Sequence, residues 1–149
     1  MAHFAELDNN NKVIRVLVAC NQDIANNGGE QSEQAAKVFQ NIVRFSENGV
    51  KWVQTSYNNN FRKQFASTNC YYDENKDKFI LNQPFPSWSL DSNDDWQPPV
   101  ERPNILTIDG TTDEVIRPLE WDEDKLTWSS FKDNIKYYWN STSNTWKTI

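Results

Sequence analysis

Acidic side chains are the groups in this sequence with the clearest capacity for chemistry. Two carboxylates are enough for a glycosidase if one of them has a raised pKa in an apolar site. Nine of the acids, however, stand in short polar stretches typical of turns, where carboxylates are normally solvated. We therefore expect them to be turn residues. They are Asp73, Glu74, Asp77, Asp91, Asp94, Asp95, Asp122, Glu123 and Asp124.

One acidic stretch partly matches a calcium-binding loop. Asp91, Asn93 and Asp95 have the spacing that opens such a loop. Trp96 stands where the loop requires glycine, and Arg102 where it requires the closing glutamate. The sequence has no other cluster of ligand residues and no phosphate-binding loop, so it predicts no metal site and no cofactor.

The sequence contains only one histidine that could act in catalysis. His3 is the only histidine and lies close to the start of the chain, whereas a Ser-His or Cys-His pair needs a firmly held base. We therefore expect no catalytic residues and no enzyme. Asn140-Ser141-Thr142 matches a glycosylation acceptor, which has meaning only in a secreted chain.

The apolar content is concentrated in aromatic rings. Among 149 residues, 37% are hydrophobic and 13% aromatic, with seven Trp, eight Phe and five Tyr. This length suits one domain, or a small domain with an appended one, and allows a core without covalent crosslinks. Each large ring needs a packing partner.

Charge and hydropathy exclude two classes of partner. The net charge is −6 and the basic residues do not cluster, so we expect no nucleic-acid partner. We expect no membrane partner either, since no stretch approaches the roughly 20 apolar residues of a spanning helix. The N-terminus has no apolar signal region, which predicts synthesis in a cytosol, where Cys20 and Cys70 are expected to be buried thiols.

The first part of the chain predicts an α+β unit over residues 1–70. Phe4 to Leu7 and Val13 to Val18 flank a polar turn and predict a β-hairpin. Apolar residues at steps of three and four predict an amphipathic helix over about residues 30–47, and a strand follows from Val50 to Val53. We expect the helix to bury Val38, Phe39, Ile42 and Val43 against the second strand of the hairpin.

Residues 71–149 repeat a pattern of two aromatic residues around a polar turn. The spacing is seven positions in three pairs and eight in one, which fits a hairpin with one ring on each arm. Such pairs would clamp the hairpins or supply an interface. The pairs are Tyr72 and Phe79, Trp88 and Trp96, Trp121 and Trp128, and Trp139 and Trp146.

Together these patterns predict an α+β fold: an N-terminal β-hairpin with one amphipathic helix, then a mainly β half of aromatic-clamped hairpins. Prolines in QPFPSW and QPPVERP separate the hairpins and cover strand edges. We expect a meandering antiparallel sheet, packed with the first unit as one compact protein.

Several blocks of the chain carry a resemblance to a known family. MAHFAELDNNNKVIRVLV, WVQTSYNNNFRKQFA, YYDENKDKFILNQPFPSWSLDSNDDWQPP and the terminal Trp139–Trp146 unit resemble small virion-structural proteins of tailed bacteriophages that infect marine cyanobacteria and related hosts. The resemblance implies a particle component without a reaction, located in the virion, whose partners are other virion proteins or copies of itself. An outward position, as a capsid decoration or on the tail, baseplate or fibre, is expected.

A carbohydrate-binding module is the alternative. Exposed Trp and Tyr faces stack on sugars, and Trp-rich hairpins also resemble choline-binding repeats, although this chain lacks the turn glycine of those repeats. Host-surface polysaccharide would then be the ligand. If the rings instead form hairpin cores or subunit contacts, they are not available to a sugar, and a row of exposed Trp would favour aggregation.

Overall fold

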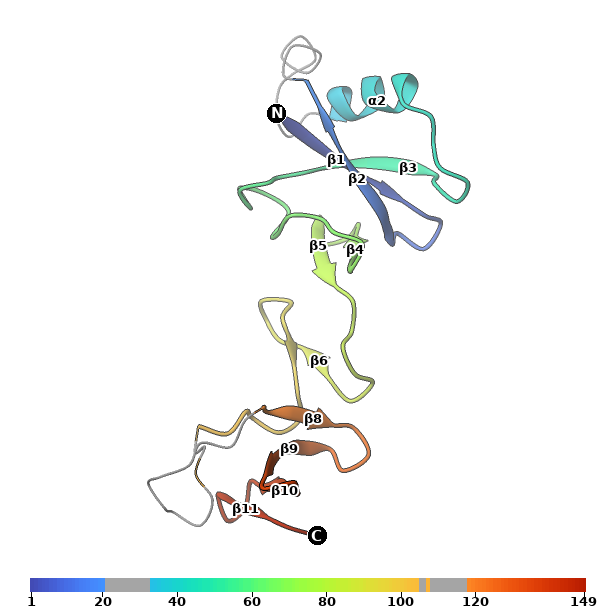
Figure 1. Cartoon of the computed structure of the whole chain (residues 1–149). Helices are drawn as coiled ribbons and strands as arrows, with labels where there is room; N and C mark the ends of the chain where they lie inside the picture. Colours follow the sequence, from blue (N-terminus) through green and yellow to red (C-terminus); the bar gives the residue numbers. More distant parts are fainter. Residues whose placement is uncertain (21–32, 105–106, 108–117) are drawn as a thin grey trace. The chain divides into compact units, whose positions relative to one another are not determined.

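A computed structural model describes residues 1–20, 33–104, 107 and 118–149 of the chain (Figure 1). The chain forms two compact units, Met1–Asn82 and Gln83–Ile149. Each unit has its own hydrophobic clusters, and none of the clusters among the described residues includes members of both units.

The N-terminal unit is built on a three-stranded antiparallel sheet in the order β2-β1-β3. The strands are β1 (Ala2–Leu7), β2 (Val13–Ala19) and β3 (Lys51–Thr55). The carboxylate of Asp8 shapes the turn between the first two strands, accepting the backbone N–H groups of Asn10 and Lys12 at 2.8 and 2.9 Å. Asn11 adopts a φ of 62°, which asparagine tolerates better than most residues.

Alternation along the strands gives this sheet two buried faces. One face presents Phe4 and Trp52 to helix α2 (Glu33–Ile42). Phe39 of the helix stacks on Phe4 with ring centroids 4.3 Å apart and meets Trp52 edge-on at 5.0 Å. The helix therefore rests on β1 and β3 as well as on β2.

Two expectations about this packing were wrong. The helix ends at Ile42 rather than near residue 47, because Phe45 stacks on Trp52 and the Arg44 carbonyl accepts a hydrogen bond from Arg15. Its predicted first residues, 30–32, lie outside the described part. Ile42 is 70% exposed and is not part of the buried face.

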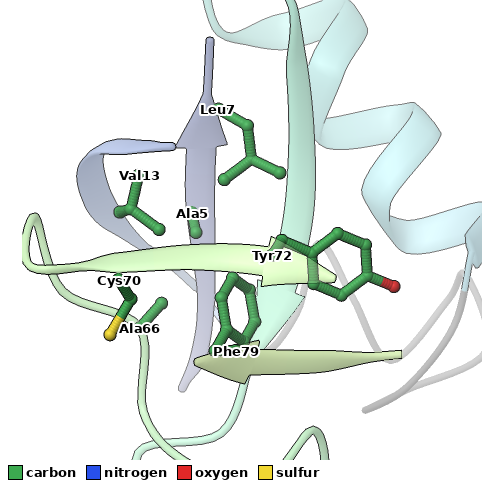
Figure 2. Close-up of a cluster of buried hydrophobic side chains, with 7 residues drawn as sticks. All are labelled: Ala5, Leu7, Val13, Ala66, Cys70, Tyr72 and Phe79. Atoms are coloured by element: carbon green, nitrogen blue, oxygen red, sulfur yellow. The ribbon is translucent and has the colours of Figure 1, made fainter. Parts of the chain in front are cut away.

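A second hairpin covers the other face of the sheet. Strands β4 (Cys70–Asp73) and β5 (Lys78–Leu81) bring Tyr72 and Phe79 against Ala5, Leu7 and Val13, as Figure 2 shows. The backbone N–H of Tyr72 also donates to the carbonyl of Asn11 at 2.8 Å.

The position of this hairpin decides where the first unit ends. The structure divides the chain after Asn82, whereas the sequence suggested residue 70, because the Tyr72–Phe79 hairpin completes the N-terminal core. Both cysteines are free thiols: Cys70 is buried as expected, whereas Cys20 is exposed.

The C-terminal unit contains a small hairpin and a four-stranded sheet. The hairpin is β6 (Ser89–Leu90) with β7 (Trp96–Gln97). The sheet has the order β11-β10-β9-β8, with β8 (Glu120–Asp122), β9 (Thr127–Lys132), β10 (Ile135–Asn140) and β11 (Thr145–Lys147). Asp133 and Asn134 join β9 to β10 with φ values of 50° and 62°, the signature of a type I′ turn.

The predicted fold class is confirmed. The described residues form a mostly β structure with one short helix, an N-terminal hairpin with a third strand, several antiparallel hairpin sheets and aromatic clusters.

Candidate functional site

Three hairpins share one turn that places aromatic residues opposite each other. An Asp or Asn opens each turn, and its side-chain oxygen accepts the backbone N–H three residues later at 3.0 Å. The fourth residue after it has a φ of 50–51°. The opening residues are Asp73, Asp122 and Asn140, and the residues with positive φ are Asp77, Leu126 and Asn144.

This turn leaves four residues between the closing pair, so the flanking aromatic residues fall into register. Tyr72 stands opposite Phe79, Trp121 opposite Trp128 and Trp139 opposite Trp146. The ring centroids of these pairs are 5.1, 5.6 and 5.4 Å apart. Each pair makes the close aromatic contact that stabilises antiparallel strands by about 0.2–1 kcal/mol.

Trp88 and Trp96 do not form such a pair. Their hairpin has a shorter turn, closed by a hydrogen bond from Asp91 N to Asp95 O at 3.0 Å, so Leu90 stands opposite Trp96. Two signals pointed to this difference. The spacing is eight positions instead of seven, and DSNDD resembles DNNNK of the first hairpin, whose turn has the same length.

The four remaining tryptophans of the C-terminal unit form its core. Tyr138 stands opposite Ser129, and one further step along this register brings Trp139 beside Trp128. Trp121, Trp128, Trp139 and Trp146 are only 2–8% exposed and form one cluster. Trp88 covers part of this cluster, meeting Trp121 and Trp128 edge-on at 6.0 and 6.2 Å. These four are therefore packing residues rather than an open stacking surface.

Hydrogen bonds fasten the covering segment to the tryptophan cluster. Trp121 Nε1 donates to Glu123 at 2.7 Å, and Glu123 also accepts the backbone N–H and hydroxyl of Ser87 at 2.9 and 2.7 Å. Trp128 Nε1 donates to the carbonyl of Val100 at 3.0 Å. The Ser87 donors hold the pKa of Glu123 below its usual range. Sequence reasoning treated Glu123 as a solvated turn acid and missed this role.

A cleft lies beside the tryptophan cluster, at the side that Trp88 covers. Its volume is about 590 Å³, and its walls include Trp88, Trp96, Pro98, Pro99, Glu101 and Arg102. A second hollow of about 450 Å³ shares Glu101 and Arg102 and continues to Asn104, Trp139, Ser141 and Asn144. The two hollows therefore have two charged residues in common.

The opposite face of the four-stranded sheet combines charged side chains with the aromatic rings of Phe131 and Tyr138. Lys136 of β10 binds Asp122 of β8 at 2.7 Å and lies 5.1 Å from the Tyr138 ring centroid. The hydrogen bond from Lys136 lowers the pKa of Asp122, and the same bond raises the pKa of Lys136. Ionic contacts therefore cross the strands on this face.

The acidic stretch at residues 91–95 is organised as a turn. Asp91 Oδ1 accepts the backbone N–H groups of Asn93 and Asp95 at 2.8 and 3.0 Å, and its Oδ2 accepts Gln97 Nε2 at 3.1 Å. Among the described residues, no group of three or more His, Cys, Asp or Glu side chains could hold a metal ion.

The single histidine belongs to an aromatic group in the N-terminal unit. His3 stacks on Tyr57 with ring centroids 5.5 Å apart and meets Phe65 edge-on at 5.3 Å. Tyr57 is 68% exposed, and Val18, which stands opposite His3 in the sheet, is 55% exposed. Together His3, Val18, Tyr57 and Phe65 form an apolar surface that we call the His3 patch.

Comparison with protein-family models, with curated proteins and with solved structures finds no match. Within the described residues, no helix is both long and apolar enough to span a membrane.

Proposed function

We propose that this chain is a non-enzymatic structural and interaction component of a tailed-phage virion. The blocks at residues 1–18, 52–66 and 71–99 and the terminal tryptophan hairpin support this proposal through their resemblance to such proteins. The protein would be made in the host cytoplasm and assembled outward-facing on the capsid, tail, baseplate or fibre.

The observation that carries the proposal is the His3 patch. Tyr57 exposes most of its surface although two neighbouring rings hold it in place. An exposed, pre-positioned aromatic side chain is the kind of anchor that dominates protein interfaces. Val18, opposite His3 on the neighbouring strand β2, adds exposed apolar area, so the patch suits a protein partner, either another virion protein or a second copy.

Purified particles of the phage that encodes the chain provide the test. Quantitative mass spectrometry after high-salt washing should find this protein at a fixed ratio to the major capsid protein. Particles that carry Tyr57→Ala should contain several-fold less of it, whereas Tyr138→Ala, on the C-terminal unit, should leave the copy number unchanged. A protein that is abundant in infected cells but missing from washed particles would contradict the proposal.

A further inference from the structure

Trp96 differs from the other hairpin tryptophans in its surroundings. The paired tryptophans of the C-terminal sheet are at most 8% exposed, whereas Trp96 is half-buried and lines the 590 Å³ cleft. That volume lies within the roughly 300–1,000 Å³ typical of small-molecule sites. The shorter turn at Asp91–Asp95 causes this difference, because it places Leu90 rather than Trp88 opposite Trp96.

Charged groups also line the cleft. Arg102 lies with its guanidinium carbon 6.0 Å from the Trp128 ring centroid, and Glu101 precedes it; both side chains are exposed. Pro98 and Pro99 restrict the backbone between Trp96 and these charges, which lowers the entropy cost of ordering the site around a ligand. Aromatic rings, a carboxylate and a guanidinium therefore line the same cleft.

We propose that this cleft binds carbohydrate, with one pyranose ring stacked on Trp96 and its hydroxyl groups hydrogen-bonded to Glu101 and Arg102. The C–H groups on the face of a pyranose match the negative face of an indole. Vicinal hydroxyls both donate and accept, so they can satisfy a carboxylate and a guanidinium at once.

The second hollow extends the site for a chain of sugars. It begins at the same Glu101 and Arg102 and offers the amide and hydroxyl groups of Asn104, Ser141 and Asn144. A linear oligosaccharide that passes Glu101 and Arg102 could therefore place further sugars in this second hollow. The inference goes beyond the virion role and does not depend on it.

Charge argues against the other ligand that aromatic clefts commonly take. A quaternary ammonium group such as choline needs ring faces without a competing cation. Arg102 places a permanent positive charge in the cleft, 6.0 Å from the ring centroid of Trp128, which also lines it. Choline is therefore expected to bind far more weakly than a sugar.

Calorimetric titration of the full chain tests the site. The probes are tetrasaccharides of glucose, mannose, galactose and N-acetylglucosamine, with choline chloride as a separate arm. At least one tetrasaccharide should bind with Kd of about 1 mM or tighter. Trp96→Ala and Arg102→Ala should each weaken that binding about tenfold or more. Phe131→Ala is the matched control, because Phe131 is 44% exposed but lies on the opposite face of the sheet from Trp128.

Trp96→Tyr keeps a stacking ring and should bind within about threefold of the native chain, which separates a binding effect from loss of the hairpin. The proposal is overturned if no tetrasaccharide binds, if choline is the tighter ligand, or if Phe131→Ala weakens binding as much as Trp96→Ala. It is also overturned if Arg102→Ala, at an exposed position, leaves sugar affinity unchanged.

Discussion

Glu6, on strand β1 of the N-terminal sheet, is a charged residue with no exposed surface. It forms an ion pair with Arg15 and accepts hydrogen bonds from the backbone N–H and hydroxyl of Ser46 at 2.6 and 2.9 Å. A β-carbon at Gly49 would overlap the Glu6 carboxylate, so any larger residue there would force the Glu6 side chain or the backbone to shift. A charged residue therefore fixes how the segment after the helix returns to the sheet.

The pKa of Glu6 leads to a prediction about acid stability. Burial alone raises this pKa, but the bonds from Arg15 and Ser46 outweigh it and leave the pKa below the ordinary 4.5. Because the folded pKa is the lower one, stability is fully present above pH 4.5 and is lost as pH falls through the folded value. Denaturant titrations between about pH 6 and pH 3 should show this loss. Glu6→Gln should flatten the dependence, whereas Glu47→Gln, at an exposed residue, should not.

Gly49 offers a second test at the same place. Gly49→Ala should destabilise the N-terminal unit by about 1–3 kcal/mol, because either the Glu6 carboxylate or the backbone must shift. Chemical unfolding measures the loss. Stability within error of the native chain would show that the Glu6 contacts are not formed as described.

Among the hairpins, the repeated turn explains why spacing predicted the aromatic pairing in three of them and not in the fourth, where the strands pair but Trp88 and Trp96 do not. A turn of four residues opened by Asp or Asn puts residues seven positions apart opposite each other, as with Trp121 and Trp128. The eight-position pair contains a shorter turn, which the hydrogen bond from Asp91 N to Asp95 O closes. Spacing alone cannot report turn length when several turns fit the same composition.

A substitution at Leu126 tests the geometry of this turn. Its φ of 51° is unfavourable for a leucine, and its side chain is 49% exposed. Glycine relieves the strain of the positive φ but gives the unfolded chain more conformational freedom, which opposes folding. Because the first effect is larger, Leu126→Gly should stabilise the C-terminal unit by about 0.5–1 kcal/mol. Lys125→Gly, one residue earlier and without positive φ, should destabilise it. Thermal unfolding of both variants separates the outcomes; the same sign for both would contradict the turn geometry.

Phe39 tests the docking of helix α2. It is 9% exposed and contacts Phe4 and Trp52, so Phe39→Ala should cost about 3–5 kcal/mol in denaturant unfolding. Gln40→Ala, on the exposed side of the helix, should cost less than about 0.5 kcal/mol. A loss below about 1 kcal/mol for Phe39→Ala would show that the helix does not pack on the sheet.

At the scale of the whole molecule, the chain consists of two units with separate cores. The sequence predicted the fold class and most strands because alternating apolar residues and polar turns are local signals. It did not predict that the Tyr72–Phe79 hairpin belongs to the first unit, nor that Glu101 and Arg102 line a cleft with Trp96. Both depend on contacts between distant segments, which no local pattern contains.

Separate cores predict separate responses to truncation. Deleting Tyr137–Ile149 removes Trp139 and Trp146, half of the paired tryptophan cluster, so the C-terminal unit should unfold while the N-terminal unit stays folded. Hydrogen exchange by mass spectrometry should show protection retained in β1, β2 and β3 and lost in β8 and β9. Deleting only Thr148 and Ile149, both exposed, is the control. Loss of protection in both units would show that they share one core.

The description of the C-terminal unit depends on a division of its tryptophans into a buried cluster and a residue that lines the cleft. The most direct test is hydrogen exchange of the indole N–H groups in deuterated water, monitored by NMR. The indole N–H groups of Trp121 and Trp128, whose side chains are 8% exposed, should exchange slowly, and that of the half-buried Trp96, which lines the cleft, should exchange faster because water reaches its ring. Equally fast exchange at all three would contradict the buried cluster, and slow exchange at Trp96 would contradict the open cleft.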